Sequence, residues 1–130
     1  MKERVRRAIG AAIINKNREI LLVQEGRVWK LPGGKPEPNE TNIECLQREV
    51  DEELNGARLD NLRHFGSFRG ITPKAGDMLE VEVYLAELIA ARVEISGEIT
   101  DAQWISEFKG RDLPDITEKI IFALQRDNVI

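Results

Sequence analysis

The chain has 130 residues, which is enough for one domain with a hydrophobic core, so we expect a single domain over residues 1–130. Apolar residues make up 42% and charged residues 32%, a globular balance that excludes an intrinsically disordered chain. With a net charge of −4, the chain lacks the excess of basic residues typical of nucleic-acid-binding proteins, so we expect no stable nucleic-acid partner. It contains no apolar run long enough to cross a bilayer, so we expect no membrane segment.

The N-terminal segment is basic and carries no apolar stretch followed by a cleavage site, so no signal peptide is predicted and a cytoplasmic location is expected. Two interpretations of its charge stay open, because the cluster fits either a solvated strand end or a contribution to phosphate binding. The cluster consists of Lys2, Arg4, Arg6 and Arg7.

Three strands are predicted before the first glycine- and proline-rich segment. Residues 5–14 are rich in Ile, Val and Ala and predict a buried strand, and residues 15–18 form a polar turn. Residues 19–24 then predict the second strand of a hairpin. After the break at Gly26, residues 28–31 predict a short further strand.

A helix over residues 41–54 follows a loop at residues 32–38, where glycines and prolines disfavour regular structure. Thr41 and Glu44 fit a capping box at its start, and Asn55 and Gly56 are suited to the left-handed conformation that ends a helix. Apolar residues at helical spacing predict the buried stripe. These residues are Ile43, Leu46, Val50 and Leu54.

The second half of the chain predicts further strands and a closing helix. In chain order we expect a strand over 58–68, a loop over 70–77, a strand over 78–88, an extension or pairing segment at 93–95, a loop over 96–101, a strand over 102–105 and an amphipathic helix over 115–126. Strands with one helix among them and one at the end predict an α/β (α+β) fold, in which helices cover the faces of a mixed sheet. Cys45 has no cysteine with which to pair, which fits a reducing compartment.

Three glutamates on the first helix indicate a metal site. Glu49, Glu52 and Glu53 fall on an arc beside the apolar stripe, at spacings where carboxylates repel one another. A hard divalent cation such as Mg²⁺ reverses the sign of that interaction, because it prefers carboxylate oxygens.

Simpler interpretations of this helix are a solvated glutamate-rich face and a surface ladder of ion pairs through Glu44, Arg48 and Glu52. The preceding loop favours the metal site. Gly33 and Gly34 allow the backbone to approach a ligand closely, a short distance before the acidic helix.

At these residues the sequence resembles the Nudix hydrolase family. The family signature is Gly, five residues, Glu, seven residues, Arg-Glu, an aliphatic residue, any residue, Glu-Glu, any residue, Gly and an aliphatic residue. Agreement at this many spaced positions makes the signal strong. The matching residues are Gly34, Glu40, Arg48, Glu49, Val50, Glu52 and Glu53.

The resemblance departs from the signature at its end, where Asn55 stands at the glycine position and Gly56 at the aliphatic one. Asn tolerates the left-handed conformation, so the helix can still end there, and no catalytic group is lost. The signature covers 23 residues of the chain, and the Trp-Lys-Leu-Pro-Gly-Gly entry and the strand ending near Trp104 also look similar to the family.

The resemblance implies an α/β/α sandwich with a mixed central sheet, and hydrolysis of a nucleoside diphosphate linked to another group. It implies that Glu49, Glu52, Glu53 and the Gly33 carbonyl bind Mg²⁺, for which Mn²⁺ can substitute. Arg48 would orient one of these glutamates. Glu40 would support the junction between the loop and the helix.

The general base is implied less definitely than the metal ligands. Glu98 occupies a position similar to an additional metal-binding or base glutamate of some family members, although an exposed loop acid explains it equally well. Between Glu49 and Glu98 as the base, we favour Glu49.

The short chain favours the compact members that convert nucleoside triphosphates, including oxidised ones, to monophosphate and pyrophosphate. Trp29 and Phe68 are candidates for stacking on a base, with a core or rim role as the alternative. Gly34 and Asp115 are further candidates for substrate contacts, although we favour an N-terminal cap for Asp115.

Other functions remain open at this stage. An ADP-ribose or sugar-nucleotide pyrophosphatase is the first alternative, and Pro73 is loosely in keeping with it. A module that senses a nucleotide without cleaving it is the second, and a purely structural domain is the third. The single histidine, His64, is interpreted as a strand side chain. A homo-oligomer is possible.

Overall fold

The computed structural model describes residues 5–72, 77–90 and 92–130. Lys2, Arg4 and Pro73, which were considered above, lie outside the described residues. The elements in chain order are β1 (Val5–Ile13), β2 (Ile20–Glu25), β3 (Val28–Lys30), β4 (Gly33–Gly34), α1 (Asn42–Glu53), β5 (Arg58–Ile71), β6 (Met78–Ile89), β7 (Ile99–Ile105) and α2 (Asp115–Arg126).

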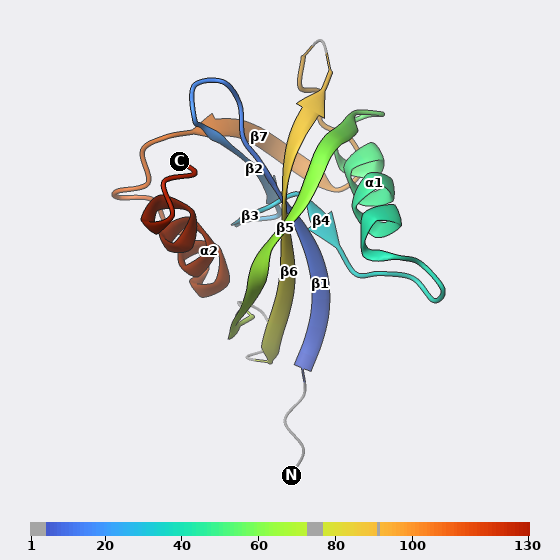
Figure 1. The fold of residues 1–130 in the computed structure, drawn as a ribbon, viewed down its shortest axis with the longest axis horizontal. Helices are drawn as coiled ribbons and strands as arrows, with labels where there is room; N and C mark the ends of the chain where they lie inside the picture. The colour runs from blue at the N-terminus through green and yellow to red at the C-terminus, as the bar shows by residue number, and fades with distance from the viewer. Residues whose placement is uncertain (1–4, 73–76, 91) are drawn as a thin grey trace.

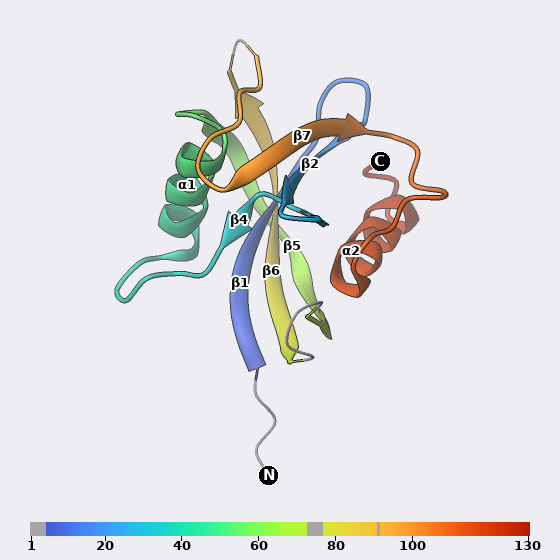
Figure 2. The same ribbon diagram turned by 180° about the vertical axis from the view of Figure 1, so that it is seen from behind.

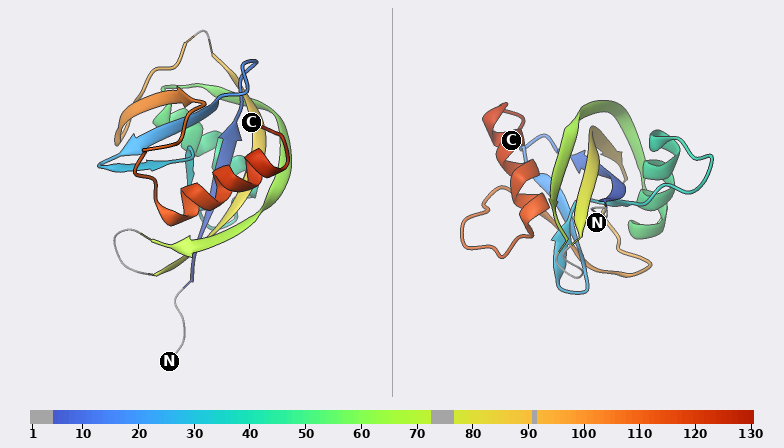
Figure 3. Two further views of the ribbon diagram at one scale, coloured as in Figure 1. Left: turned by 90° about the vertical axis from the view of Figure 1, so that its left-hand side faces the viewer. Right: turned by 90° about the horizontal axis from the view of Figure 1, so that it is seen from below.

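The described strands form two sheets, one of order β4-β1-β6-β5 and one of order β3-β2-β7. The larger sheet is mixed, because β1 and β6 are parallel whereas β4 and β5 are antiparallel to their neighbours. The two helices lie on opposite sides of these strands (Figure 1), and the view from below in Figure 3 agrees. The predicted α+β fold with helices covering a mixed sheet is confirmed.

The predicted hairpin between the first two strands is wrong. β1 pairs with β4 and β6, whereas β2 pairs with β3 and β7, and a single bridge between Ile14 and Ile20 joins the two segments. In Figure 2, β2 and β7 run across β1 and β6. Residues 9–13 of β1 and residues 20–23 of β2 are all buried, so both faces of these stretches are covered, which explains why they are continuously apolar rather than alternating.

Two hydrophobic clusters correspond to the two helices. Ile9, Ala11 and Ile13 of β1 face the cluster that contains α1, whereas Ala12 faces the cluster that contains α2. Successive side chains of a strand point to opposite faces, so β1 contributes to both. The strand is thereby held between the two helices.

Helix α1 begins and ends as predicted. The Thr41 hydroxyl accepts a hydrogen bond from the Glu44 amide at 3.1 Å, and the Glu44 carboxylate accepts one from the Thr41 amide at 2.9 Å. Asn55 and Gly56 both adopt positive φ, at 46° and 82°. Asn55 thus fulfils the conformational role of the signature glycine that it replaces.

The buried stripe of α1 differs from the prediction at one position. Leu46, Val50 and Leu54 are buried, but Ile43 is 38% exposed and Cys45 is buried in its place. The Cys45 thiol donates to the Gly34 carbonyl at 3.6 Å. The helix is therefore rotated toward β4, which the sequence pattern alone did not indicate.

Strands in the second half are longer than predicted. Strand β5 continues through Gly70 and Ile71, because both residues pair with β6. Strand β7 begins at Ile99 rather than Ala102, because it pairs with β2 up to Glu25. Residues 93–95 form no strand, so the extension expected there is wrong.

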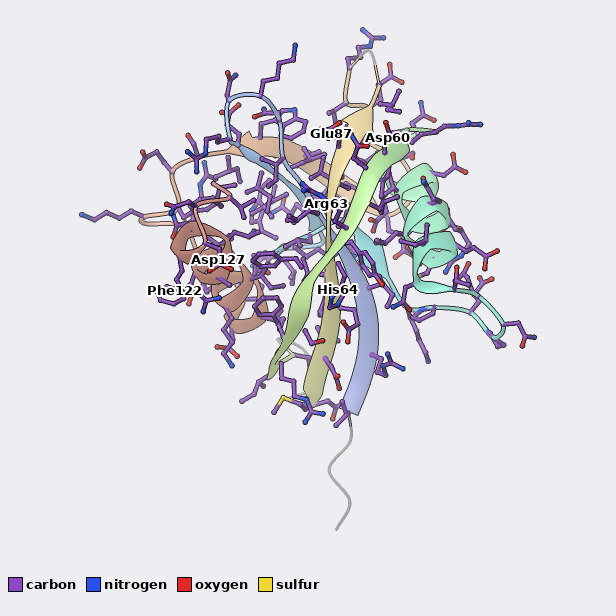
Figure 4. All side chains as sticks on the ribbon, viewed as in Figure 1. Asp60, Arg63, His64, Glu87, Phe122 and Asp127 are labelled. Carbon is purple, nitrogen blue, oxygen red and sulfur yellow. The ribbon has the colours of Figure 1, made fainter. Side chains whose placement is uncertain are left out.

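Helix α2 packs its apolar face against the sheets and leaves Phe122 on its outer side, 65% exposed (Figure 4). In the part of the chain that the structure describes, no helix combines the length and apolar character that crossing a membrane requires.

The rotation of α1 predicts unequal costs for two alanine substitutions. Leu46→Ala should lower the free energy of unfolding by about 2–5 kcal/mol, because Leu46 is fully buried and the substitution leaves a cavity. Ile43→Ala should lower it by less than about 1 kcal/mol, since Ile43 is partly exposed. Urea denaturation of both variants measures the difference, and equal costs would contradict the observed orientation of α1.

Candidate active site

Gly33 and Gly34 form the floor of the site, and they do so as strand β4 rather than as the irregular loop that was predicted. They pair with Gly10 and Ile9 of β1. Gly33 adopts φ +146°, and a Cβ atom there would lie 2.0 Å from the Ile9 carbonyl oxygen. No residue other than glycine fits this position, which explains how the segment can lie directly against β1.

Glu53 is buried at the end of α1, and its side chain reaches β4. Its Oε1 atom accepts a hydrogen bond from the Gly33 amide at 2.9 Å, and its Oε2 atom lies 3.2 Å from Lys30 Nζ. Lys30 Nζ also donates to the Gly33 carbonyl at 3.3 Å. Two of the predicted metal ligands, Glu53 and the Gly33 carbonyl, thus already face one positive charge.

Glu49 lies one turn earlier on α1 and packs against Gly34. A Cβ atom at Gly34 would lie 2.5 Å from the Glu49 carboxyl carbon. The missing side chain therefore makes room for the carboxylate, and this explains the second glycine. The Glu49 side chain is 17% exposed, so it remains accessible to a ligand.

Glu52 and Glu98 are more exposed than Glu49 and Glu53. The Glu52 side chain is 57% exposed, and its Oε1 atom lies 3.5 Å from Arg48 Nη1. Glu98 is exposed in a turn that leads into β7. This turn follows Ser96, whose hydroxyl donates to the Glu52 carbonyl at 2.6 Å, so Glu98 lies near the C-terminal end of α1.

Arg48 connects the loop before α1 to the glutamates of the helix. Its Nε and Nη2 atoms donate to the two carboxylate oxygens of Glu40 at 2.7 and 3.0 Å, and Nη2 also donates to the Lys35 carbonyl at 3.1 Å. Its Nη1 atom donates to Glu49 at 3.0 Å. These hydrogen bonds join the loop to the helix and hold the Glu49 side chain against Arg48.

The carboxylates differ in their electrostatic surroundings. The hydrogen bonds from Arg48 lower the pKa of Glu40 to about 2. Desolvation by burial instead raises the pKa of Glu49 and of Glu53, more than Arg48 and Lys30 lower them. The contacts with Arg48, Lys30 and Gly33 thus do not fully compensate the loss of hydration of these two carboxylates, and a cation beside them would favour their charged forms.

The donors present fit a divalent cation in chemistry. Carboxylate and carbonyl oxygens are what Mg²⁺ binds, and the ammonium of Lys30 between Glu53 and Gly33 shows that these oxygens already point toward a positive charge. Within residues 5–72, 77–90 and 92–130, no three carboxylate, imidazole or thiolate groups converge to hold a metal alone. Glu52 would have to turn from Arg48 to join the other two.

An apolar cavity of about 160 Å³ lies against the same two glycines. It lies between β1, β6 and α2, and Lys30 forms part of its wall. The remaining lining residues are Ala8, Ile9, Gly10, Leu31, Gly33, Gly34, Leu79, Val81, Ile116, Thr117 and Ile120.

Of the predicted substrate-binding residues, Gly34 lines this cavity, whereas the other three make different contacts. Trp29 and Phe68 pack against the hydrophobic cluster of α2, and Phe68 stacks on Phe65 with ring centroids 6.0 Å apart. Asp115 makes no N-terminal cap, contrary to the favoured interpretation. Its Oδ2 atom accepts a hydrogen bond from the Ile71 amide at 3.3 Å, so it joins α2 to β5.

Two residues of the site were missed by the sequence analysis. Lys30 lies three residues before Gly33, but nothing in its strand pattern shows that its side chain turns toward α1. Thr117 is 1% exposed and donates its hydroxyl to the Trp29 carbonyl at 3.1 Å. A polar residue on the apolar face of α2 is a signal from which the sequence analysis could have identified Thr117.

Two further sets of polar side chains lie away from the glycine pair, namely Arg6 with Arg7, and His64. Arg6 and Arg7 line a hollow of about 460 Å³ together with Lys35, and Arg6 Nε lies 3.0 Å from Asp77. Both interpretations of the basic segment therefore stay open. His64 is on β5 (Figure 4), where its Nε2 atom lies 2.6 Å from Glu82 Oε2, in keeping with a strand side chain.

Solved structures share this architecture. A MutT protein from Methanosarcina mazei matches with a TM-score of 0.78 at 24% identity, over 98% of both chains. A MutT Nudix hydrolase from Burkholderia pseudomallei matches with a TM-score of 0.76 at 26% identity, over 95% of this chain and 98% of the other. Because the Methanosarcina mazei protein is only 24% identical, its match shows a shared fold and nothing more.

The hydrogen bonds from Arg48 to Glu40 predict how the stability of the protein depends on pH. A carboxylate whose pKa is lowered in the folded state stabilises the fold fully above its ordinary pKa, here 4.5, and loses that contribution as pH falls to about 2. Glu40→Gln should therefore flatten the decline of unfolding free energy across this range. Urea denaturation at several pH values tests this, with the exposed Glu107→Gln as a control for charge. Superimposable profiles of Glu40→Gln and the wild type would contradict the prediction.

The family was first indicated by residue spacing and is now supported by independent matches. An 8-oxo-dGDP phosphatase from Mus musculus is 44% identical over 48 residues, which is 33% of this chain and 15% of that relative's length. The NUDIX domain model matches residues 4–115, which include the glycine pair, Arg48 and the glutamates. The chain therefore belongs to the Nudix hydrolase family.

Proposed function

We propose that this chain is a Mg²⁺-dependent pyrophosphohydrolase that converts nucleoside triphosphates, oxidised ones among them, to the monophosphate and pyrophosphate. One observation carries the proposal. The same glycine pair meets the carboxylates of α1 and borders an apolar cavity, so a charged and an apolar subsite adjoin. A nucleotide combines charged phosphates with a less polar base, and these two parts correspond to the two subsites.

The cavity suits the base rather than the whole substrate. Its volume of about 160 Å³ is smaller than the roughly 300–1,000 Å³ of pockets that enclose a drug-sized ligand. It therefore accepts one apolar portion of a nucleotide. The phosphates then extend past Gly33 and Gly34 toward Glu49 and Glu53.

The glutamates supply the metal site in this proposal. Glu53, Glu49 and the Gly33 carbonyl would hold the ion, and Glu52 would join them if it turned from Arg48. An ion held by these residues would offset the phosphate charge and make a bound water easier to deprotonate. Mn²⁺ is expected to substitute for Mg²⁺, because it also accepts carboxylate, carbonyl and water ligands.

Glu49 is the general base that we favour in this site. It is partly exposed, lies against Gly34 and is held by Arg48 at 3.0 Å, so its orientation is fixed while a water can reach it. Glu98 stays an alternative base or additional ligand. The exposed position of Glu98 near the end of α1 leaves it free to face the phosphates.

The name of the Mus musculus relative points to an oxidised nucleoside diphosphate, and this chain spans 15% of that protein's length. A panel of substrates tests the proposal directly: nucleoside triphosphates, oxidised nucleotides, dinucleoside polyphosphates and ADP-ribose, each with and without Mg²⁺, with products identified. Turnover restricted to ADP-ribose or sugar nucleotides would replace the proposed substrate class. Nucleotide binding without turnover at saturating Mg²⁺ would indicate a sensing module.

The proposed metal site predicts the effect of one isosteric change. Glu53→Gln should lower turnover by roughly 100-fold or more, because removal of a single electrostatic contact to a transition state has this scale of effect. The exposed Asp51→Asn on the same helix is the matched control and should retain activity. Steady-state kinetics with Mg²⁺ measures both, and thermal denaturation checks that both variants fold. Near-normal activity of folded Glu53→Gln would remove Glu53 from the metal site.

The proposed base subsite predicts a change in binding. Ala8→Leu places a larger side chain into the cavity wall and should raise the KM for nucleotides by about tenfold, which corresponds to about 1.4 kcal/mol of lost binding free energy. Metal affinity should stay unchanged, because Ala8 belongs to a cavity wall that includes none of the glutamates. Ala90→Leu, at an exposed position after β6, is the control. An unaltered KM in Ala8→Leu would place the base elsewhere.

A further inference from the structure

Lys30 lines the cavity wall, but the proposed function gives its charged group no role. Its ammonium lies 3.2 Å from Glu53 Oε2 and donates a hydrogen bond to the Gly33 carbonyl at 3.3 Å. A third oxygen, Glu25 Oε1, lies 3.6 Å away. One flexible cation thus contacts three oxygens from three elements.

The two nearer oxygens belong to groups that the proposed function assigns to the metal. Mg²⁺ binds oxygen at about 2.0–2.1 Å, so a bound ion and the ammonium would compete for the same lone pairs of the Gly33 carbonyl and Glu53. Their positive charges would also repel at such short range. Lys30 in this position therefore disfavours the binding of a metal to the same oxygens.

We infer that Lys30 is the resident counter-ion of the metal-free site and that its ammonium leaves Glu53 and Gly33 when a divalent cation binds. The inference rests on the proposed function, because it takes Glu53 and the Gly33 carbonyl as metal ligands.

Glu25 provides the position to which Lys30 moves. It lies at the end of β2, which pairs with β3, and its side chain is 40% exposed compared with 8% for Glu53. The lysine side chain has several rotatable bonds, so its ammonium can turn toward Glu25 without a change in the backbone. Its charge then stays paired while the metal replaces it.

The exchange has a cost and a benefit for the protein. Without a metal, Glu53 would be a buried carboxylate without a countercharge, and such a group destabilises a fold. Lys30 prevents this and keeps the Gly33 carbonyl turned toward the site. In return, each metal that binds must displace Lys30, which lowers the observed metal affinity.

Metal affinity provides the first test. In Lys30→Met, Mn²⁺ should bind about fivefold more tightly or better, the lower end of the coupling between ligands that affect one another's binding. Isothermal titration calorimetry with Mn²⁺ alone measures this affinity. Lys35→Met removes the same charge from the loop after Gly34 and is the control. Thermal denaturation without metal should show that Lys30→Met is less stable than Lys35→Met.

A second test uses the unaltered protein, so it does not depend on whether Lys30→Met folds. The reactivity of each lysine toward an amine-modifying reagent is followed by mass spectrometry during titration with Mg²⁺. Labelling of Lys30 should increase as the metal binds, because its ammonium leaves the carboxylate. Labelling of Lys35 should stay constant.

The outcomes separate this inference from the proposed function. Equal Mn²⁺ affinity in the wild type and both variants, with Lys30 labelling that does not rise with Mg²⁺, would overturn the role of Lys30 alone. Weaker Mn²⁺ binding in folded Lys30→Met would overturn it as well. Absence of Mn²⁺ binding in all three proteins would instead contradict the metal site itself, and with it this inference.

Discussion

The hydrogen bond from the Gly33 amide to the buried carboxylate of Glu53 joins three parts of the molecule. It connects the last turn of α1 to β4, and β4 in turn pairs with β1 at the centre of the fold. A carboxylate buried to this degree needs partners, and here they are an amide and a lysine. This contact joins the last turn of α1 to β4, while the hydrophobic cluster around Leu46 and Val50 packs the rest of the helix on the sheet.

Two glycines make that arrangement possible for different reasons. Gly33 must approach the β1 backbone, where a side chain would collide with the Ile9 carbonyl, and Gly34 must leave space for the Glu49 carboxylate. The pair is thus shaped by the sheet on one side and by the helix on the other. The cavity beside it is bounded by α2, so both helices help to form the site.

Charge at the site is distributed unevenly, and this has a chemical consequence. Arg48 hydrogen-bonds to Glu40, Glu49 and the Lys35 carbonyl, which joins the loop to the helix, but burial still raises the pKa of Glu49 and of Glu53. Lys30 supplies one further positive charge from β3. Because desolvation outweighs these contacts for Glu49 and Glu53, a divalent cation beside them would favour their charged forms.

The sequence by itself determined the features that depend on short spacing along the chain. The capping box, the left-handed exit at Asn55 and Gly56, and the register of the signature follow from neighbouring residues, and so does the α+β class. Local geometry limits what such patterns can form, so they could be predicted without knowledge of the rest of the chain.

Only the tertiary structure decided which strands pair and where long side chains point. The hairpin expected between β1 and β2 does not form, and the two strands belong to different sheets. Both strands bury two faces, so the local sequence pattern does not identify the strands with which they pair. The local pattern likewise did not predict that Cys45 is buried instead of Ile43, that Lys30 points toward Glu53, or that a cavity lies beside the glycine pair. Each depends on contacts between segments distant in the chain, such as α1 with β4, and spacing along one segment carries no information about them.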